Sequence, residues 1–594
     1  MQYPRRTRCF SLAIILSLLW FSSNLTATDP PREPFHALVD EIWETDMRED
    51  PLFATSAGDH RYNDRLPATS LADSVRRSQT NQDFLRRLKK IDREQLMPND
   101  RVNYDILLRQ IEDLLAEHRF QVYLIPITQR AGFHLEFPEL PKNVPLNTVK
   151  DFENYAARLK AFSKYAQGHI ELLRAGIAAG QTLPEVVLTG WEEALDAQIV
   201  EKPEQSLLFE PCKKFPSTVA NSEHKRLRTS VRDSIATSVV PGYRKFRQFM
   251  ETEYVPQARG SIGASALAGG RDFYRHRVRK FTTLDLTPGE VHNIGLAEVK
   301  RIRAEMDAII QRVEFAGDFS AFAKFLREDP RFYATSKQEL LKEVSYALKQ
   351  MDGKLPELFG RLPRMPYGLR EVPDYVAPRT TAAYYLRASG DGTRAGFFYM
   401  NTYDLKSRPL YTVEALSFHE AVPGHHLQLA LQQEIEDLPN FRRYSGFTAY
   451  VEGWALYSER LGIEAGFYAD PYSDFGRLTM EIWRACRLVV DTGIHYFGWS
   501  RERAIDYMRD NSSLSLHNIR AEVDRYISWP GQALAYKIGE MKIRELRAIA
   551  EEQLGDRFDV RSFHDAVLIS GSVPLDVLEA NVKAWIAKQS INQQ

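Results

Sequence analysis

Two histidine-containing groups and a glutamate lie close together in the segment 417–432, SFHEAVPGHHLQLALQ. His419 and Glu420 are adjacent, and His425 and His426 follow within seven residues. Zinc sites in enzymes use neutral imidazoles and carboxylates as ligands, with a nearby carboxylate that accepts a proton from an activated water. Packing alone gives little reason for this density of metal-binding side chains. The segment therefore predicts a zinc-dependent hydrolase, and a peptidase is the first class to consider.

The spacing of the histidines differs from the HExxH motif, in which ligands at i and i+4 face one metal. Position i+4 from His419 is Pro423, so the candidates are His425 at i+6 and His426 at i+7. On an unbroken helix, His425 would lie about 120° from His419 around the axis, and His426 about 10 Å further along it. Because Pro423 and Gly424 are expected to break the helix, either histidine could reach the metal. We favour His425, because its Gly-His step copies the HExGH form of the motif.

A third ligand is expected from the segment Tyr444–Leu461, which has the pattern of a helix. Glu452 lies there among apolar neighbours, and carboxylates are rarely buried without a partner. Glu459 is the alternative ligand, but it stands between a serine and an arginine, which indicates a solvated or salt-bridged role. His419, one histidine of the second pair and Glu452 would leave a fourth position for water, as in catalytic sites, with Glu420 as the general base.

The elements that position these residues are predicted to be mainly helices. Aromatic and aliphatic residues recur every three or four positions in 152–165 and in a second helix that begins at Thr287. Strands are few, and the proline-rich segment 362–378 is expected to be an ordered connection. The candidate strands are Gln121–Ile125, Ala382–Leu386 and Gly396–Asn401. This pattern favours a large helical fold with one small β-sheet and excludes a Rossmann fold or a barrel.

Composition limits the function classes. The chain has 594 residues, of which 44% are hydrophobic, and a formal net charge of −1. Since no flexible linker or repeat divides it, residues 28–594 are expected to form one domain. Since no basic stripe is present, nucleic acid is not an expected partner.

The N-terminus has the pattern of a signal peptide over residues 1–27. Three arginines precede the apolar run Phe10–Phe21, and Leu25-Thr26-Ala27 offers a small-residue cleavage site. A bilayer span takes about 20 residues, so no stable membrane insertion is expected after cleavage. The protein is expected to be exported to the periplasm or secreted, with an uncleaved anchor as the alternative. Cys9 lies at the start of the apolar run, where a lipoprotein cysteine would not be.

Two cysteines remain after cleavage, Cys212 and Cys486. An exported protein could pair them, and the sequence leaves the pairing open. Cys486 lies in an apolar helical run, so a structural role is favoured over a nucleophilic one.

Several segments carry a family resemblance over nearly the whole mature chain. The matching segments are GFFYMNTYDL (396–405), ALSFHEAVPGHHLQ (415–428), YVEGWALYSERLG (450–462), DTGIHYFGWS (491–500) and DRYISWPGQALAYKIGE (524–540). In these segments the chain resembles the DUF885 family of bacterial proteins, which is grouped with gluzincin-like metallopeptidases. The resemblance implies a zincin-like fold with one zinc ion per chain.

A looser resemblance extends to the mainly helical gluzincins, such as the thimet oligopeptidase and angiotensin-converting enzyme groups. It implies that Glu452 is the third ligand and that a late tyrosine donates a hydrogen bond to the oxyanion. Tyr526 is similar to that tyrosine, and Tyr536 is the second choice. The resemblance also implies that the strand at 396–401 is the edge strand that holds an extended peptide.

The function expected from these observations is hydrolysis of peptide bonds, in short peptides, by zinc-activated water. Two other classes stay open. One is a zinc hydrolase of a non-peptide amide or ester. The other is a periplasmic binding protein whose metal site is degenerate.

Overall fold

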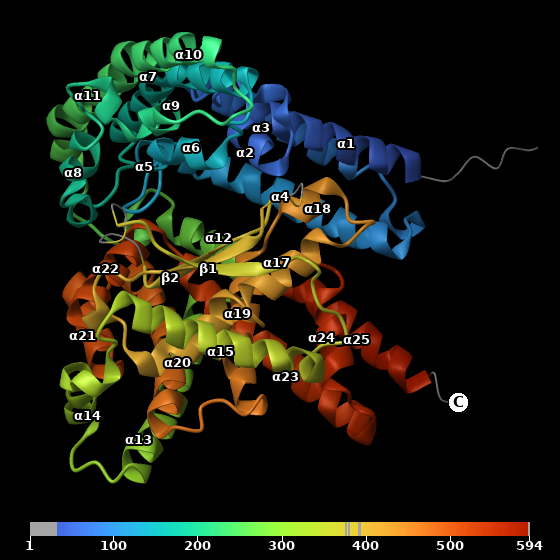
Figure 1. The fold of residues 1–594 in the computed structure, drawn as a ribbon. Helices are drawn as coiled ribbons and strands as arrows, with labels where there is room; N and C mark the ends of the chain where they lie inside the picture. Colours follow the sequence, from blue (N-terminus) through green and yellow to red (C-terminus); the bar gives the residue numbers. More distant parts are fainter. Residues whose placement is uncertain (1–31, 375–376, 378–380, 390–391, 393, 592–594) are drawn as a thin grey trace, which may run out of the picture.

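The fold is mainly helical with one small sheet, as predicted. The computed structural model describes residues 32–374, 377, 381–389, 392 and 394–591, so the predicted signal peptide lies outside the described residues. In Figure 1 the N-terminal helices α1 to α11 lie above the sheet together with the short α18 (Asn440–Tyr444), and the C-terminal helices α20, α21 and α23 to α25, in orange and red, lie below it. The sheet and the segment 417–432 therefore lie near the middle of the chain's fold.

The longer helices are spread along the whole described chain, with short helices, turns and the sheet between them. In the first half they are α1 (Arg32–Glu49), α3 (Leu71–Leu88), α4 (Pro98–Arg119), α7 (Val149–Ala178), α10 (Asn221–Ser234), α11 (Val240–Phe249), α12 (Gly270–Thr282) and α13 (Pro288–Arg312). In the second half they are α14 (Phe319–Glu328), α15 (Lys337–Leu358), α19 (Thr448–Glu464), α20 (Pro471–His495), α21 (Arg501–Asn511), α22 (Leu516–Ser528), α23 (Ala535–Leu554) and α25 (Leu575–Ile591).

The two helices predicted from periodicity are confirmed as α7 and α13. Each begins with a reciprocal cap in which a threonine, Thr148 or Thr287, accepts a hydrogen bond from the third backbone N–H of the helix. The acidic side chain at that third position accepts one from the threonine N–H in return. These caps satisfy N–H groups that have no partner within the helix.

The sheet has three strands in the order β1-β3-β2. They are β1 (Tyr367–Glu371), β2 (Ala383–Leu386) and β3 (Gly396–Met400). β1 runs parallel to β3, and β2 runs antiparallel to it. The predicted strands 382–386 and 396–401 are thus confirmed. The expectation that 396–401 is an edge strand is wrong, because the proline-rich segment 362–378 contributes β1 to its other side.

One predicted strand is absent. Residues 121–125 follow α4 directly, and Val122–Leu124 form a single 3₁₀ turn. Gln121 adopts the left-handed conformation (φ 56°), which turns the chain away from the helix axis. Residue types that favour strands were therefore not enough to form a strand here. The chain turns at this site, and among the described residues no strand pairs with it.

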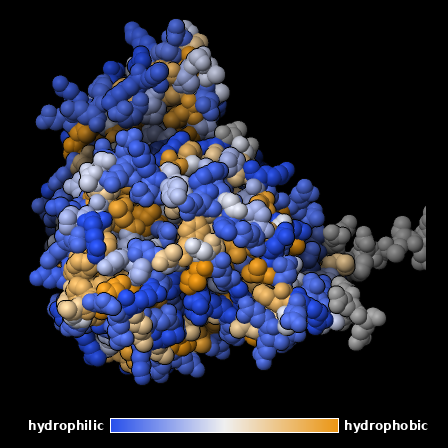
Figure 2. Space-filling view, turned by 60° about the horizontal axis from the view of Figure 1, so that its bottom comes forward, coloured by the Kyte–Doolittle hydropathy of each residue, from blue (hydrophilic) through white to orange (hydrophobic). Residues whose placement is uncertain are grey.

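The drawn face of the surface is polar, and both cysteines among the described residues are buried. The face drawn in Figure 2 is mostly hydrophilic, with hydrophobic residues in scattered groups. Among the helices in the described ranges, none is both long and apolar enough to cross a bilayer. Cys212 and Cys486 are buried and form no disulfide. Burial raises the pKa of each thiol to about 12, which fits the structural role that we expected.

Helices α19 and α23 cross in direct backbone contact at two glycines, Gly453 and Gly539. A Cβ atom added to Gly539 would lie 1.9 Å from the carbonyl oxygen of Ala449, and one added to Gly453 would lie 2.5 Å from the Gly539 Cα. Only glycine allows two helices to approach so closely. The crossing brings the part of α19 around Gly453, which follows Glu452, against the part of α23 around Gly539, one turn after Tyr536.

We expect Gly539→Ala to lower the free energy of unfolding by about 2–3 kcal/mol, because the added methyl group overlaps backbone atoms that cannot rotate away. Thermal unfolding followed by circular dichroism measures the effect. Gly353→Ala is the matched control, since Gly353 lies inside α15 with no atom within 4 Å of the added Cβ. It should be neutral or slightly stabilising. Equal melting temperatures for the wild type and Gly539→Ala would contradict the close crossing.

Candidate metal centre

The segment 413–433 forms two helices separated by a break, as the proline and glycine predicted. α16 (Val413–Glu420) ends at Glu420, and α17 (His425–Gln433) begins at His425. A Cβ atom on Gly424 would lie 2.0 Å from the carbonyl oxygen of His419, so the chain folds back onto the last turn of α16. The break brings the rings of His419 and His425 to a centroid distance of 4.9 Å, at 83° to each other.

Glu452 of α19 completes a group of three potential metal ligands with His419 and His425. One atom from each lies within 4.8 Å of the others. The distance between Glu452 Oε2 and Nε2 is 3.5 Å for His419 and 3.6 Å for His425. Ligand atoms about 2.1 Å from a tetrahedral zinc are about 3.4 Å apart, whereas a good N–H···O hydrogen bond is shorter than about 3.2 Å. The spacing of the three residues therefore fits a zinc ion.

The other nitrogen of His419 is held by Glu459, about two turns beyond Glu452 along α19. His419 Nδ1 and Glu459 Oε1 are 2.8 Å apart, and Glu459 is 1% exposed. The solvated role expected for Glu459 is therefore wrong, because its side chain points into the core. A carboxylate on Nδ1 fixes the ring and leaves Nε2 free to face the other ligands, as in many zinc sites.

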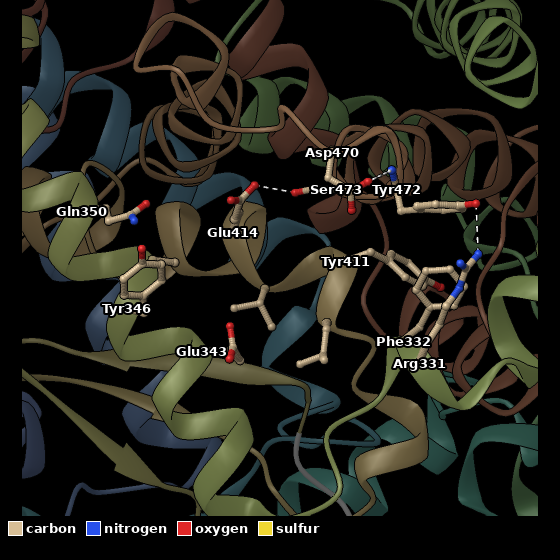
Figure 3. Close-up of a pocket in the computed structure, with 13 residues that line it drawn as sticks. Arg331, Phe332, Glu343, Tyr346, Gln350, Tyr411, Glu414, Asp470, Tyr472 and Ser473 are labelled. Atoms are coloured by element: carbon tan, nitrogen blue, oxygen red, sulfur yellow. Dashed lines mark hydrogen bonds between the residues drawn. The ribbon is translucent and has the colours of Figure 1, made fainter. Parts of the chain in front are cut away.

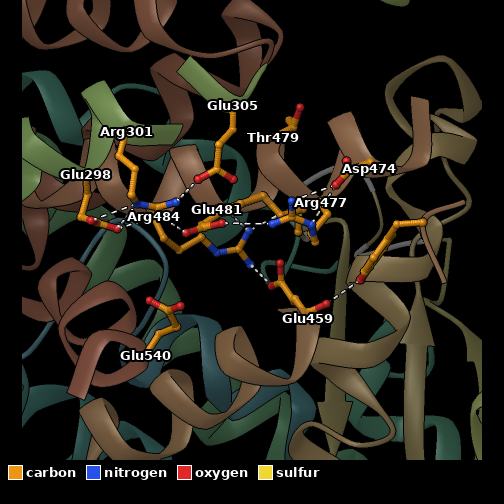
Figure 4. A network of polar contacts seen from close by, with 12 residues as sticks. Glu298, Arg301, Glu305, Glu459, Asp474, Arg477, Thr479, Glu481, Arg484 and Glu540 are labelled. Carbon is orange, nitrogen blue, oxygen red and sulfur yellow. Dashed lines mark hydrogen bonds and ion pairs between the residues drawn. The ribbon is translucent and has the colours of Figure 1, made fainter. Parts of the chain in front are cut away.

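Glu459 also connects the three ligands to a buried polar network. Its carboxylate lies 3.6 Å from a guanidinium nitrogen of Arg484 on α20. Figure 4 shows Arg484 beside a chain of alternating charges that includes Glu481, Arg477 and Arg301. Lys537 completes this chain with a contact of 2.7 Å to Glu481. Each buried charge has an opposite charge beside it, which offsets the cost of removing it from water.

Replacing Glu459 with glutamine is expected to weaken metal binding about 10-fold or more, because the amide orients His419 less well and lowers its basicity. Competition with a chromogenic zinc chelator measures the affinity. Glu464→Gln is the control on the same helix, because Glu464 pairs with Arg547 at the surface. If both variants bound zinc like the wild type, the contact between Glu459 and His419 would have no role in the site.

The three candidate ligands, His419, His425 and Glu452, have displaced pKa values. Burial lowers the pKa of His425 to about 4, so its imidazole is neutral and available as a ligand. Burial also disfavours the charged forms of His419 and Glu452, but their mutual contact outweighs it. Together with Glu459 that contact raises the pKa of His419 to about 9, and the two histidines lower that of Glu452 to about 2. Displaced values in such a cluster are typical of functional sites.

Glu420 stands directly beside His419 at the end of α16. Burial, aided by the negative charge of Glu452, raises the pKa of Glu420 to about 7, although His419 opposes the shift. A carboxylate whose pKa is near neutrality can both accept and return a proton. The acidity of Glu420 is therefore suited to proton transfer near neutral pH.

His426 lies apart from the three ligands. Its Nδ1 is 2.8 Å from the hydroxyl of Tyr385 on β2, and its ring packs at 4.8 Å from the ring of Tyr367 on β1. Of the two histidines that the sequence left open, the structure thus brings His425 to His419 and Glu452, and uses His426 to join α17 to the sheet.

The two candidate tyrosines also differ in whether they lie towards the three ligands or apart from them. Tyr526 is 1% exposed, and its hydroxyl accepts hydrogen bonds from Trp483 Nε1 (3.2 Å) and Arg487 Nε (3.0 Å). Tyr536 is partly exposed. Burial and then the charge of Glu452 raise the pKa of Tyr536, and the close crossing of α19 and α23 brings together the two helices that carry these residues. The structure brings Tyr536, our second choice, towards the group and leaves Tyr526 in the core.

Two arginines near the group did not appear among our sequence predictions. Arg484 and Arg487 lie one turn apart on α20, and both are buried. The guanidinium of Arg487 lies 4.4 Å above the ring of Tyr536. The sequence carried a signal for them, since two arginines in the otherwise apolar run EIWRACRLVV need buried partners just as Glu452 does.

A separate cavity of about 560 Å³ lies at the opposite end of α16 (Figure 3). Its lining includes Tyr346 of α15, Glu414 of α16 and Ser473 of α20. Glu414 accepts hydrogen bonds from the Ser473 hydroxyl and from the backbone N–H of Tyr468. None of the three candidate ligands lines this cavity, so we do not assign it to the metal centre.

Comparison with known proteins shows the family. A solved structure described as a putative lipoprotein from Colwellia psychrerythraea is 30% identical, with a TM-score of 0.89 over 93% of this chain and 99% of that one. A putative lipoprotein of unknown function from Shewanella oneidensis is 17% identical, with a TM-score of 0.69 over 92% and 99%, which shows a shared fold. No curated protein matches the chain. Residues 51–582 match the family model described as bacterial protein of unknown function, and the chain therefore belongs to the DUF885 family.

Proposed function

We propose that this chain is a zinc-dependent peptidase. The observation that carries the proposal is the spacing of His419, His425 and Glu452, whose ligand atoms lie 3.5–3.6 Å from the shared carboxylate oxygen. When bound there, zinc would supply a Lewis acid that activates water and polarises a carbonyl group. Three protein ligands leave a fourth position open, which is typical of catalytic rather than structural zinc.

The residues around this position supply the remaining chemistry. The Glu420 carboxylate would accept a proton from the attacking water and pass it to the leaving amine. The phenol of Tyr536, on the helix that crosses α19, would donate a hydrogen bond to the oxygen that becomes negative during the attack. Glu459 would keep His419 in the tautomer that presents Nε2.

Short peptides are the proposed substrates, and the protein is proposed to act after export. Helices enclose the three ligands on several sides, which favours a short, flexible chain over a folded protein. Export is supported by the N-terminal pattern and by the description of both solved relatives as lipoproteins. The periplasm and the surrounding medium are both included as proposed destinations.

Incubation of the zinc-loaded protein with a mixture of synthetic peptides tests the proposal. Mass spectrometry should detect new peptide termini, which should disappear with 1,10-phenanthroline and return when zinc is added. A panel of esters and non-peptide amides is incubated in parallel. It tests the alternative that the protein is a zinc hydrolase of a non-peptide substrate. Cleavage of that panel but of no peptide would replace the peptidase proposal. Zinc binding without any hydrolysis would favour a binding protein.

A further inference from the structure

Positive charge is in excess on one side of the candidate metal centre. Three guanidinium groups share the single carboxylate of Glu522 on α22. Arg487 lies 3.2 Å from it, Arg525 lies 3.0 Å from it, and Arg130 lies 3.3 Å from it. The Glu522 side chain is 3% exposed, so bulk water does little to balance this charge. A buried cluster with more cations than anions is stabilised when an anion binds to it.

Arg487 is the member of this cluster with an unused donor. Its Nε donates to the hydroxyl of Tyr526 and its Nη2 to Glu522. Its Nη1 is buried and has no hydrogen-bond partner among the residues that the structure describes. The side chain is 4% exposed. An unpaired, buried and charged N–H group is costly, and such groups call for a partner that comes from outside the protein.

Arg525, a second guanidinium of this cluster, already has hydrogen-bond partners within the protein. Arg525 donates to Glu522 and, through Nη1, to the amide oxygen of Gln532 at 2.6 Å. Within the cluster on Glu522, Arg487 therefore has the buried N–H that no described residue accepts. Arg484, whose Nε is likewise buried without a partner, lies outside this cluster and is paired with Glu459.

Arg487 packs against Tyr536, one of the residues proposed to take part in the reaction. Its guanidinium lies between the rings of Trp483 at 4.5 Å and Tyr536 at 4.4 Å. Arg487 therefore packs directly against Tyr536, whose phenol is proposed to donate a hydrogen bond to the oxyanion.

We propose that Arg487 binds the C-terminal carboxylate of the peptide substrate, so that cleavage falls near the C-terminus. The inference rests on the proposed peptidase function and narrows its substrate class to peptides with a free α-carboxylate. Arginine suits this role because a charged N–H donor forms short, strong hydrogen bonds with carboxylate oxygens. A peptide whose C-terminus is an amide would leave the charge of Arg487 unmatched.

Matched peptides test this inference. Each sequence is prepared with a free C-terminal carboxylate and as the C-terminal amide, and kcat and KM are measured for both with the zinc-loaded enzyme. The wild type should prefer the acid by about 10- to 100-fold in kcat/KM, and the new termini should lie near the C-terminus. Calorimetry with the zinc-loaded Glu420→Gln variant should show the same preference in binding, without turnover.

Arg487→Gln should bring the acid-to-amide ratio close to one, and Arg487→Lys should retain part of it. Arg158→Gln is the control, because Arg158 is also buried and also has a free Nη1, but lies in the N-terminal layer against carbonyl oxygens. Its ratio should equal that of the wild type. The ratio is internal to each variant, so partial misfolding lowers both rates and leaves it unchanged.

Two outcomes would overturn the inference, and each can be told from failure of the peptidase proposal. Equal cleavage and binding of acid and amide by the wild type would refute the carboxylate site while leaving a peptidase, even if no Arg487 variant folded. An acid preference that persisted in Arg487→Gln would assign it to another residue. Absence of both cleavage and binding for every peptide would refute the peptidase proposal itself, and the carboxylate site with it.

Discussion

Replacing Glu420 with glutamine is expected to lower kcat for peptide hydrolysis by about 10²- to 10⁴-fold while the zinc content stays near one per chain. Burial raises the pKa of Glu420 to about 7, so at neutral pH the wild-type carboxyl exchanges protons readily. The amide of glutamine has nearly the same shape and cannot accept a proton in this way. Because Glu420 is not among the three proposed ligands, metal binding should survive.

Plasma mass spectrometry for zinc and initial rates on a cleaved peptide measure the two quantities. Glu414→Gln, at the other end of α16, is the control, and its rate should remain close to that of the wild type. A Glu420→Gln protein that kept both zinc and full activity would remove Glu420 from the mechanism as general base, while peptide cleavage itself would still identify a peptidase.

The second large effect is expected in the zinc content of two neighbouring histidine variants. His425→Ala should lower zinc from about one per chain to below about a tenth, because it removes one of three ligands. His426→Ala should keep about one zinc per chain, because that ring contacts Tyr385 and Tyr367 instead. Glu452→Ala should resemble His425→Ala.

The adjacent histidines control for each other, since both substitutions remove an imidazole from the first turn of α17. Purified proteins are loaded with zinc, desalted and analysed together. Loss of zinc in His426→Ala with retention in His425→Ala would move the ligand to His426. A wild type that retained no zinc even after loading would end the hydrolase proposal and favour a binding role.

Short segments of the sequence were enough to predict part of the site. A histidine-glutamate pair, a proline-glycine break and a glutamate in an apolar helix are all visible in short segments, and the structure brings His419, His425 and Glu452 together. The choice between His425 and His426 needed more, because it depends on how the four-residue break turns the chain. No propensity rule specifies the backbone angles of Gly424, which are φ −76° and ψ −127°.

Contacts between residues far apart in the chain determine the features of the site and the sheet that the sequence did not predict. Whether Tyr526 or Tyr536 approaches Glu452 depends on the crossing of α19 and α23, whose residues are far apart in the chain. The central place of β3 depends on β1, which comes from a proline-rich segment with little strand pattern. The burial of Glu459 was missed because its flanking residues are polar, whereas its partner His419 lies 40 residues away.

The glycine crossing of α19 and α23 has a consequence for hydrogen exchange. With no side chain between the two backbones, the amide protons near Gly453 and Gly539 can meet solvent only when the helices separate. That separation also parts Glu452 from Tyr536, so there is no small local opening that spares one and exposes the other. These amides should therefore exchange among the slowest in the chain, at the rate of global unfolding. A partly unfolded form of this protein would therefore keep Glu452 and Tyr536 together or separate them entirely.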